Sequence, residues 1–475
     1  MRKFLFFTSA FFLSGCATLN SQESFDEVKN TIEERTGQKL VWNQEGSEDG
    51  DVKKQIAELL RGSLTVDDAL KISLLNNPTL QAEYEELGVA QSELVQAGLL
   101  QNPVLSFERR FRGKAAEADI SQNFLSLFLI PLRTKAASAE LEAEIKKVTQ
   151  LVLNHTTEVT SAFYSLQAEQ QSLEMRESVV KALNASYEAA RALREAGNTT
   201  LLEVQNEANM LAQAKVELAQ ASVRVLEERE HLNVLLGAWG NNTGWRIENR
   251  LPNLPNEEVT LPGLESFAIS HRLDLAAAKN ELESVAAKVG IARYEALIPD
   301  LTLTGHYERE PEGTITRGPS VVFPVPLFNW GKAASAQGNA LFRQSLRRYE
   351  AMAIELRSKV RVAYGRMKAA RMRAEYFYKE VLPLQKKTLE QTELFYNGMF
   401  VGVFQLLQAK QAQITAGQSY IETLKEYWLR RTELEQAVGG SFKGLSTSNE
   451  IPISGAIPQV EIESPSNGHQ HHHGN

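Results

Sequence analysis

The sequence predicts a mainly α-helical protein with a small β part, built from two tandem copies of one unit. Three observations support this prediction. The same motifs recur in the same order about 200 residues apart, each copy contains a short segment of alternating polarity, and each contains a long heptad-patterned stretch. Each unit should therefore run helix, β-hairpin, long helix and shorter helix.

Composition sets the broad class of protein. The chain has 475 residues, of which 43% are hydrophobic and 23% charged, an ordinary balance for a folded protein. Its formal net charge is −8, which argues against a nucleic acid partner because phosphates attract basic patches. The single cysteine excludes an intrachain disulfide and metal sites that need two or more cysteines.

The N-terminus is typical of an export signal. A basic start precedes an apolar run, Phe4 to Phe12, that is too short to span a bilayer. The following Leu-Ser-Gly-Cys resembles a bacterial lipobox, which implies removal of residues 1–15 and acylation of Cys16. Several acyl chains anchor a protein stably, and Ala17 after the cysteine favours the outer membrane. The alternative is an ordinary signal peptide with a chance cysteine.

Two further segments are polar and lack periodicity. Residues 16–62 are predicted to form a tether between the lipid and the body of the protein. Residues 441–475 are predicted to be a disordered tail. The tail contains clustered histidines that could bind Cu, Zn or Ni, or that are incidental: His469, His471, His472 and His473.

The first repeat is predicted over 63–240 and the second over 261–440, joined by a linker at 241–260. The offset between matching motifs is about 195 to 202 residues. The matching motifs are Asn77–Leu80 with Arg272–Leu275, Pro103–Phe107 with Pro299–Leu303, Pro131 with Pro326, Gly197 with Gly398, and Gly237 with Gly439. Each match alone is weak, but their common order indicates a duplication.

Each repeat should open with one helix, at 64–100 and 261–297, that ends before a proline. A hairpin should follow at about 103–130 and 299–326, because apolar and polar residues alternate there. Four strands per chain cannot close a barrel, whereas a homotrimer would supply twelve. The prediction is a 12-stranded β-barrel per trimer, and the alternative is a soluble hairpin with one buried face.

Long helices are predicted at 132–236 and 331–438, each interrupted by one turn. Residues 132–196 contain neither Pro nor Gly, enough for about 98 Å of helix. Apolar residues recur there in a heptad register, which indicates a coiled-coil α-barrel part. His155 lies on this seam and is interpreted as a core residue rather than a ligand. In the second repeat, Pro383 should kink the helix.

This doubled layout behind a lipobox resembles the TolC-like outer membrane factors, in particular their lipoprotein branch of cation and heavy-metal efflux channels. The local matches are Gly197 with Glu203 to Asn206, and Gly398 to Ala409. The resemblance implies a homotrimer with a pore in the outer membrane and a helical part in the periplasm. It also implies a periplasmic adaptor (membrane fusion protein) and an inner-membrane pump of the resistance-nodulation-division type. No catalytic centre is implied, and no cofactor beyond the lipid on Cys16.

The resemblance also implies a gate at the helical tips, where the family often places carboxylates after the turn glycine. Glu203 occupies such a position, and Gln405 is its counterpart, with Gln408 one turn further on. A ring of three Glu203 side chains would attract cations. The alternative is that Glu203 is a solvated surface residue.

Other functions fit the sequence less well. It lacks His-Glu-x-x-His, Gly-x-Ser-x-Gly and phosphate-binding glycine loops, which argues against an enzyme. A periplasmic coiled-coil adaptor or structural lipoprotein would use one helical hairpin, whereas two are predicted here. A type I secretion duct on the same fold remains open, and the cargo could be metal cations, organic toxicants or peptides.

Overall fold

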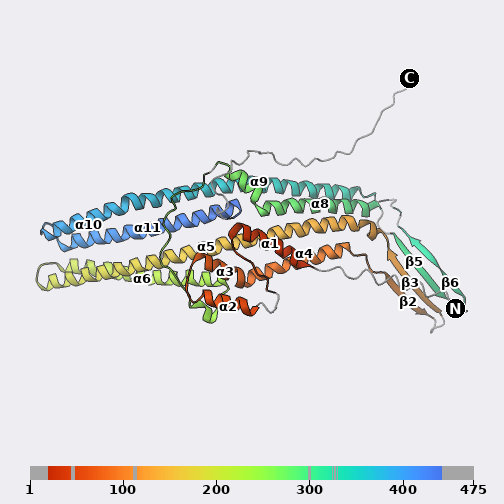
Figure 1. The fold of residues 1–475 in the computed structure, drawn as a ribbon, viewed down its shortest axis with the longest axis horizontal. Helices are drawn as coiled ribbons and strands as arrows, with labels where there is room; N and C mark the ends of the chain where they lie inside the picture. The colour runs from red at the N-terminus through yellow and green to blue at the C-terminus, as the bar shows by residue number, and fades with distance from the viewer. Residues whose placement is uncertain are drawn as a thin grey trace, which may run out of the picture.

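The computed structural model describes residues 20–43, 49–110, 115–260, 262–297, 301–323, 325, 328 and 330–440. The molecule is a long rod of helices with a four-stranded sheet at one end (Figure 1). The mainly helical class predicted from the sequence is confirmed. Within the described part of the chain, no helix combines the length and the apolar character needed to cross a lipid bilayer.

Each repeat contributes the same series of elements. Those of the first are α3 (Val66–Asn76), α4 (Pro78–Gly98), β2 (Val104–Arg110), β3 (Ala115–Asn123), α5 (Leu125–Glu195) and α6 (Leu201–Leu236). Those of the second are α7 (Leu264–His271), α8 (Leu273–Leu297), β5 (Thr302–Arg309), β6 (Ile315–Val322), α9 (Lys332–Tyr376), the π-helical turn η3 (Phe377–Val381), α10 (Leu382–Asn397) and α11 (Val403–Val438). The order of elements is therefore duplicated.

The longest helix, α5, is the spine of the rod. Its 71 residues correspond to about 107 Å. The predicted heptad seam is buried along most of its length, with Val152, Val159 and Leu166 fully inaccessible to solvent. Helices α4, α6, α8 and α11 all pack along it. Near the turn the core thins to a small cluster around Leu183 and Leu211.

The single helix predicted over 64–100 is in fact two helices, α3 and α4. Asn77 divides them, because its side chain accepts hydrogen bonds from the first N–H groups of α4 and Pro78 starts the new helix. The same side chain donates 2.9 Å to the carbonyl of Leu235, near the end of α6. The start of α4 and the end of α6 thus lie next to each other, beside α5.

The second repeat has an equivalent joint, so the helix predicted over 261–297 is likewise divided, at Arg272. Arg272 donates 2.6 Å to the carbonyl of Gln436, near the end of α11. Two glycines allow the close approach: Gly237 has φ 64° and a Cβ there would lie 2.6 Å from a backbone oxygen of α3, while Gly439 has φ 96° beside the end of α7. Glycine adopts this left-handed conformation without steric cost.

The predicted return strand of the first hairpin, to residue 130, is too long. β3 ends at Asn123, whose side chain accepts 2.9 Å from the N–H of Leu125 and so starts α5. Pro131 then lies inside this helix. It is the seventh residue of α5, so this proline does not mark a helix boundary. In the second repeat, β6 ends at Val322.

Part of the segment predicted as a polar tether is folded, as α1 (Ser21–Thr36) and α2 (Asp49–Leu59). Phe25, Val28 and Ile32 form a buried face of α1 against α4 and α5. Their spacing of three and four residues is that of an amphipathic helix, a signal the composition-based interpretation overlooked. Arg35 then donates to the carbonyls of His271 and Gly439, at 2.9 and 2.7 Å. The N-terminal helix therefore joins both repeats.

The inter-repeat linker is also ordered. It contains η2 (Gly240–Thr243) and β4 (Arg246–Ile247), which pairs in parallel with β1 (Ser63–Leu64). Trp245 is buried and donates 2.9 Å to Asn233 of α6, while Arg229 stacks over its ring. These contacts attach the linker to the end of the first repeat.

In the second long helix, a π-helical turn, η3, ends two residues before Pro383, the residue at which a kink was predicted. A π-helical turn inserts one residue and so relieves the clash between a proline ring and the preceding turn. Gly338 does not interrupt α9, because it is needed where α8 comes close: a Cβ there would lie 3.0 Å from Val289.

Candidate functional site

The predicted gate residues lie at the end of the rod opposite the sheet. Here α5 turns into α6 and α10 turns into α11, and the two tips lie side by side (Figure 1). Because both tips come from one chain, each copy contributes two unequal tips.

The first tip is firmly capped. Gly197 ends α5 in the left-handed conformation, φ 78°. Thr200 is the N-cap of α6: its N–H donates 2.9 Å to the carboxylate of Glu203, and its hydroxyl accepts from the Glu203 N–H. Hydrogen bonds from Thr199 and from the backbone and side chain of Thr200 lower the pKa of Glu203. Glu203 is thus an ionised carboxylate held in place at the tip.

The second tip is more apolar and less well capped. Gly402 precedes α11 and supplies no side-chain cap. Gln405 is the third residue of α11, the position that Glu203 holds in α6. Met399 and Phe400 are 93% and 80% exposed. A neutral, hydrophobic turn therefore stands beside an acidic, polar one.

The predicted equivalence of Gly197 and Gly398 is off by one residue. Gly398 has φ −82°, and the left-handed residue of the second turn is Met399, φ 61°. Gly237 and Gly439 correspond at an offset of 202, and the same offset pairs Gly197 with Met399. The repeat alignment matched Gly197 with the nearest glycine, Gly398. In the structure, the residue with the left-handed conformation is Met399.

Gln408 lies in a groove of about 390 Å³ between the first helical hairpin and α11. Glu207 and Ser186 line the same groove, and the Ser186 hydroxyl donates 2.5 Å to the Glu207 carboxylate. Glu207 is 9% exposed. Glu207 was not predicted as a site residue, although it follows Glu203 by one helical turn. Glu203 and Gln405 do not line this groove; they lie in the first turns of α6 and α11.

A second functional surface is the sheet, in the antiparallel order β2-β3-β5-β6. Along β5 the apolar face is the more exposed one: Leu303 and Tyr307 are exposed, whereas His306 and Glu308 are half-buried. Leu105 and Phe107 of β2, on the same face as Leu303, are 75% and 71% exposed. The polar side chains of β3 and β5 are half-buried, with Asp119 and His306 facing each other across these two strands. A water-soluble sheet shows the reverse, with its apolar face buried.

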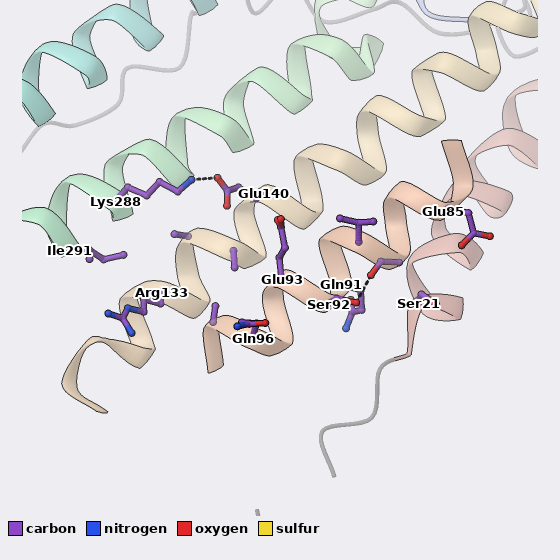
Figure 2. Close-up of a pocket in the computed structure, with 15 residues that line it drawn as sticks. Ser21, Glu85, Gln91, Ser92, Glu93, Gln96, Arg133, Glu140, Lys288 and Ile291 are labelled. Atoms are coloured by element: carbon purple, nitrogen blue, oxygen red, sulfur yellow. Dashed lines mark hydrogen bonds and ion pairs between the residues drawn. The ribbon is translucent and has the colours of Figure 1, made fainter. Parts of the chain in front are cut away.

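A groove of about 1040 Å³ runs along α5 between α4 and α8 (Figure 2). Small residues such as Ala136 and Ala137 line it, and Lys288 of α8 pairs with Glu140 of α5 across it. Arg133 reaches Glu295 at 3.4 Å. The groove is therefore a helix-packing surface with ion-paired walls.

Two predicted sites lie outside the described residues: the lipidation site Cys16 and the tail histidines His469, His471, His472 and His473. His155, by contrast, is described and is buried at 9% exposure. Its Nε2 contacts the hydroxyl of Ser73, which agrees with a core role.

The family profile described as outer membrane efflux protein matches residues 264–440. Among curated proteins, the cobalt-zinc-cadmium resistance protein CzcC of Cupriavidus metallidurans is 24% identical over 392 residues, covering 80% of this chain and 90% of CzcC. The toluene efflux pump outer membrane protein TtgC of Pseudomonas putida is 25% identical over 303 residues, covering 58% of this chain and 60% of TtgC.

Solved structures share the fold. A membrane protein from Pseudomonas aeruginosa superposes with a TM-score of 0.68 at 16% identity, covering 79% of this chain and 92% of that one. The channel CusC superposes with a TM-score of 0.66 at 16% identity, with the same coverage. The duplicated layout and these solved structures show that the chain has the fold of the TolC-like outer membrane factors, and its second repeat matches the outer membrane efflux protein family in sequence.

Proposed function

We propose that three copies of this chain form a passive exit duct through the bacterial outer membrane for a tripartite efflux system. The observation that carries the proposal is the polarity of the sheet, which exposes apolar side chains on one face and half-buries the polar side chains of the central strands β3 and β5 on the other. Such a sheet suits lipid on one face and a water-filled lumen on the other.

The edges of the sheet support a trimer. In a single chain, β2 and β6 each have a neighbour on one side only. Unpaired backbone groups in lipid cost several kcal/mol each, so a membrane sheet must close on itself. Three chains of four strands give 3 × 4 = 12 strands, within the known range of closed barrels.

The helical rod would then extend into the periplasm as an α-barrel. A periplasmic adaptor would contact its tips, and an inner-membrane pump of the resistance-nodulation-division type would supply the energy. The acylated Cys16 would anchor each copy in the outer membrane. Support comes from relatives that are named efflux pump outer membrane proteins.

At the tips, three Glu203 carboxylates would form an acidic ring that favours cations, while Gln405 and Gln408 leave the second tip neutral. The test is single-channel recording in planar bilayers. Glu203→Gln should lower the cation-to-anion permeability ratio, whereas Glu188→Gln, which removes an exposed carboxylate about two turns before the end of α5, should not. An equal permeability ratio in the parent protein and in both variants would refute the proposed acidic gate.

For the cargo we propose divalent metal cations, because CzcC is named for cobalt, zinc and cadmium resistance. The tail histidines would capture metal near the duct. Deleting the gene should lower the tolerance of the host to Zn, Co or Cd, and the wild-type gene should restore it. Loss of tolerance to organic toxicants alone, or of peptide export alone, would instead favour a different pump or a type I secretion duct on the same fold.

The duct itself is tested by purified protein. Trimers that conduct ions in bilayers support it. Protein that becomes fully soluble and monomeric after Cys16→Ser would support a coiled-coil adaptor or structural lipoprotein instead.

A further inference from the structure

Three metal-ligating side chains converge on the polar face of the sheet. Glu117 and Asp119 of β3 and His306 of β5 each place one ligand atom within 4.8 Å of the other two. His306 Nδ1 lies 2.6 Å from Asp119 Oδ1 and 4.0 Å from Glu117 Oε1. They meet because Asp119 and His306 are cross-strand partners and Glu117 is two residues away on the same face.

Neighbours bind the second carboxylate oxygens of Asp119 and Glu117, and a carboxylate lies near the second ring nitrogen of His306. Ser106 donates to Asp119 Oδ2 at 3.4 Å, and Arg110 binds Glu117 Oε2. On the far side of the imidazole, His306 Nε2 lies 3.7 Å from a Glu308 carboxylate oxygen. One atom of each of the three groups thus remains directed at a shared point. Neighbours that fix ligand orientation in this way are characteristic of metal sites.

The charge on this face favours a cation. The carboxylates of Glu108, Glu117, Asp119 and Glu308 share it with one guanidinium, Arg110, and one imidazole. The facing residues of β6 carry no charge: Thr316 is paired with Glu308 and Gly318 with His306. A divalent ion would offset this excess of negative charge.

We propose that Glu117, Asp119 and His306 form a binding site for a divalent transition metal ion, with Zn²⁺ as the representative. One imidazole nitrogen and two carboxylate oxygens suit such an ion, and three protein ligands leave a coordination position for water. Binding replaces the His306–Asp119 hydrogen bond and releases the proton from Nδ1. Ligand atoms around Zn²⁺ lie about 3.3 Å apart. Glu117 Oε1, now 4.0 Å from His306 Nδ1, must therefore move closer to it, and Asp119 Oδ1, now 2.6 Å away, must move apart from it.

The location of the site depends on the proposed function, because only a trimeric duct puts three such sites around one lumen. In that lumen, a bound ion could exchange with metal cations that pass through the duct. The binding chemistry itself depends only on residues within one sheet, so the site and the duct can be tested separately.

The test is titration of detergent-solubilised full-length trimers with Zn²⁺ by calorimetry, and with Co²⁺ by visible absorption. The tail histidines are first replaced by alanine in every protein compared, so that they contribute no binding. We expect one ion per chain. His306→Gln and Asp119→Asn should weaken binding at least about tenfold, and Glu308→Gln, which only orients the ring, should weaken it about tenfold.

Matched controls are His231→Gln, an exposed histidine of α6, and Glu312→Gln in the β5–β6 turn. Both should bind as the parent does, and trimer migration on native gels checks the fold of each variant. Anomalous diffraction at the zinc edge should place the ion between β3 and β5. Binding that is absent from the parent, or equal in all variants, overturns the site and leaves a purely structural His–Asp contact. Zinc binding without ion conductance would instead overturn the duct and leave the site intact.

Discussion

Lys425 of α11 donates a 2.8 Å hydrogen bond to Glu169 of α5, and this ion pair joins the second repeat to the first. Arg224 of α6 reaches the other carboxylate oxygen at 3.1 Å. Burial by itself would raise the pKa of Glu169, but the hydrogen bonds and charges of Lys425 and Arg224 outweigh it and lower the pKa. A charged residue on the heptad seam is thus the meeting point of three helices.

Removing this carboxylate should destabilise the rod. Glu169→Gln leaves the Lys425 ammonium, 17% exposed, without its main counter-charge, and the expected loss is about 3 kcal/mol of unfolding free energy. Circular dichroism during urea unfolding of the detergent-solubilised protein measures it. The control is Glu433→Gln, whose partners Arg366 and Arg430 are exposed and whose loss should cost below about 1 kcal/mol. Similar losses of unfolding free energy in both variants would show that the Glu169–Lys425 pair does not stabilise the rod more than an exposed pair does.

His155 should make stability depend on pH. Burial lowers its pKa, against the opposing effect of the Leu235 carbonyl. The unfolded chain therefore takes up a proton at a higher pH than the folded chain does. The contribution of His155 is complete above the unfolded-state pKa of about 6.5 and is lost as pH falls toward the folded-state value.

Within that window the loss should approach about 1.4 kcal/mol per pH unit. Ser73 uses its only proton to donate 2.7 Å to the Leu235 carbonyl, so it accepts from His155 Nε2–H. His155→Gln should flatten the dependence between pH 7 and pH 5, measured by urea midpoints, whereas His231→Gln should preserve it. An unchanged slope in His155→Gln would be evidence against this role.

The two tips should respond oppositely to substitution at their left-handed residues. Met399→Gly removes the side chain that opposes φ 61° and should stabilise the second tip by about 0.5 to 1 kcal/mol. Gly197→Ala adds a Cβ that is sterically unfavourable at φ 78°, so it should destabilise the first tip by about 1 kcal/mol or more. Amide hydrogen exchange of the turn residues measures both, and changes of the same sign would refute the one-residue shift in the repeat alignment.

The N-terminal helix should be a structural part of the body. Phe25 is 2% exposed, and its ring lies 5.2 Å from that of Tyr84 in α4. Phe25→Ala should cost about 3 to 4 kcal/mol of α1 docking and expose the segment to protease. Glu23→Ala, on the exposed side of α1, is the control. Equal protease resistance of both variants would restore the tether interpretation.

Much of this architecture follows from local sequence. The heptad run of α5 determines which apolar stripe is buried, so the seam is predictable, although the first residues of the helix were predicted as strand. The alternation around Leu105 and Phe107 predicted which side chains share a face of β2. The duplicated order of motifs predicted the second repeat. Each of these signals is periodic and therefore survives in a single sequence.

Other features depend on contacts between distant segments, and only the tertiary structure decided them. Asn77 divides a helix because its side chain serves both α4 and the end of α6, which lies 158 positions away. Met399 adopts a glycine conformation because the helices on either side fix the turn. Glu117, Asp119 and His306 meet only because β3 pairs with β5, which joins the two repeats edge to edge. Strand pairing between repeats leaves no periodic trace in the sequence, so a site shared by two strands appears only when the chain is folded.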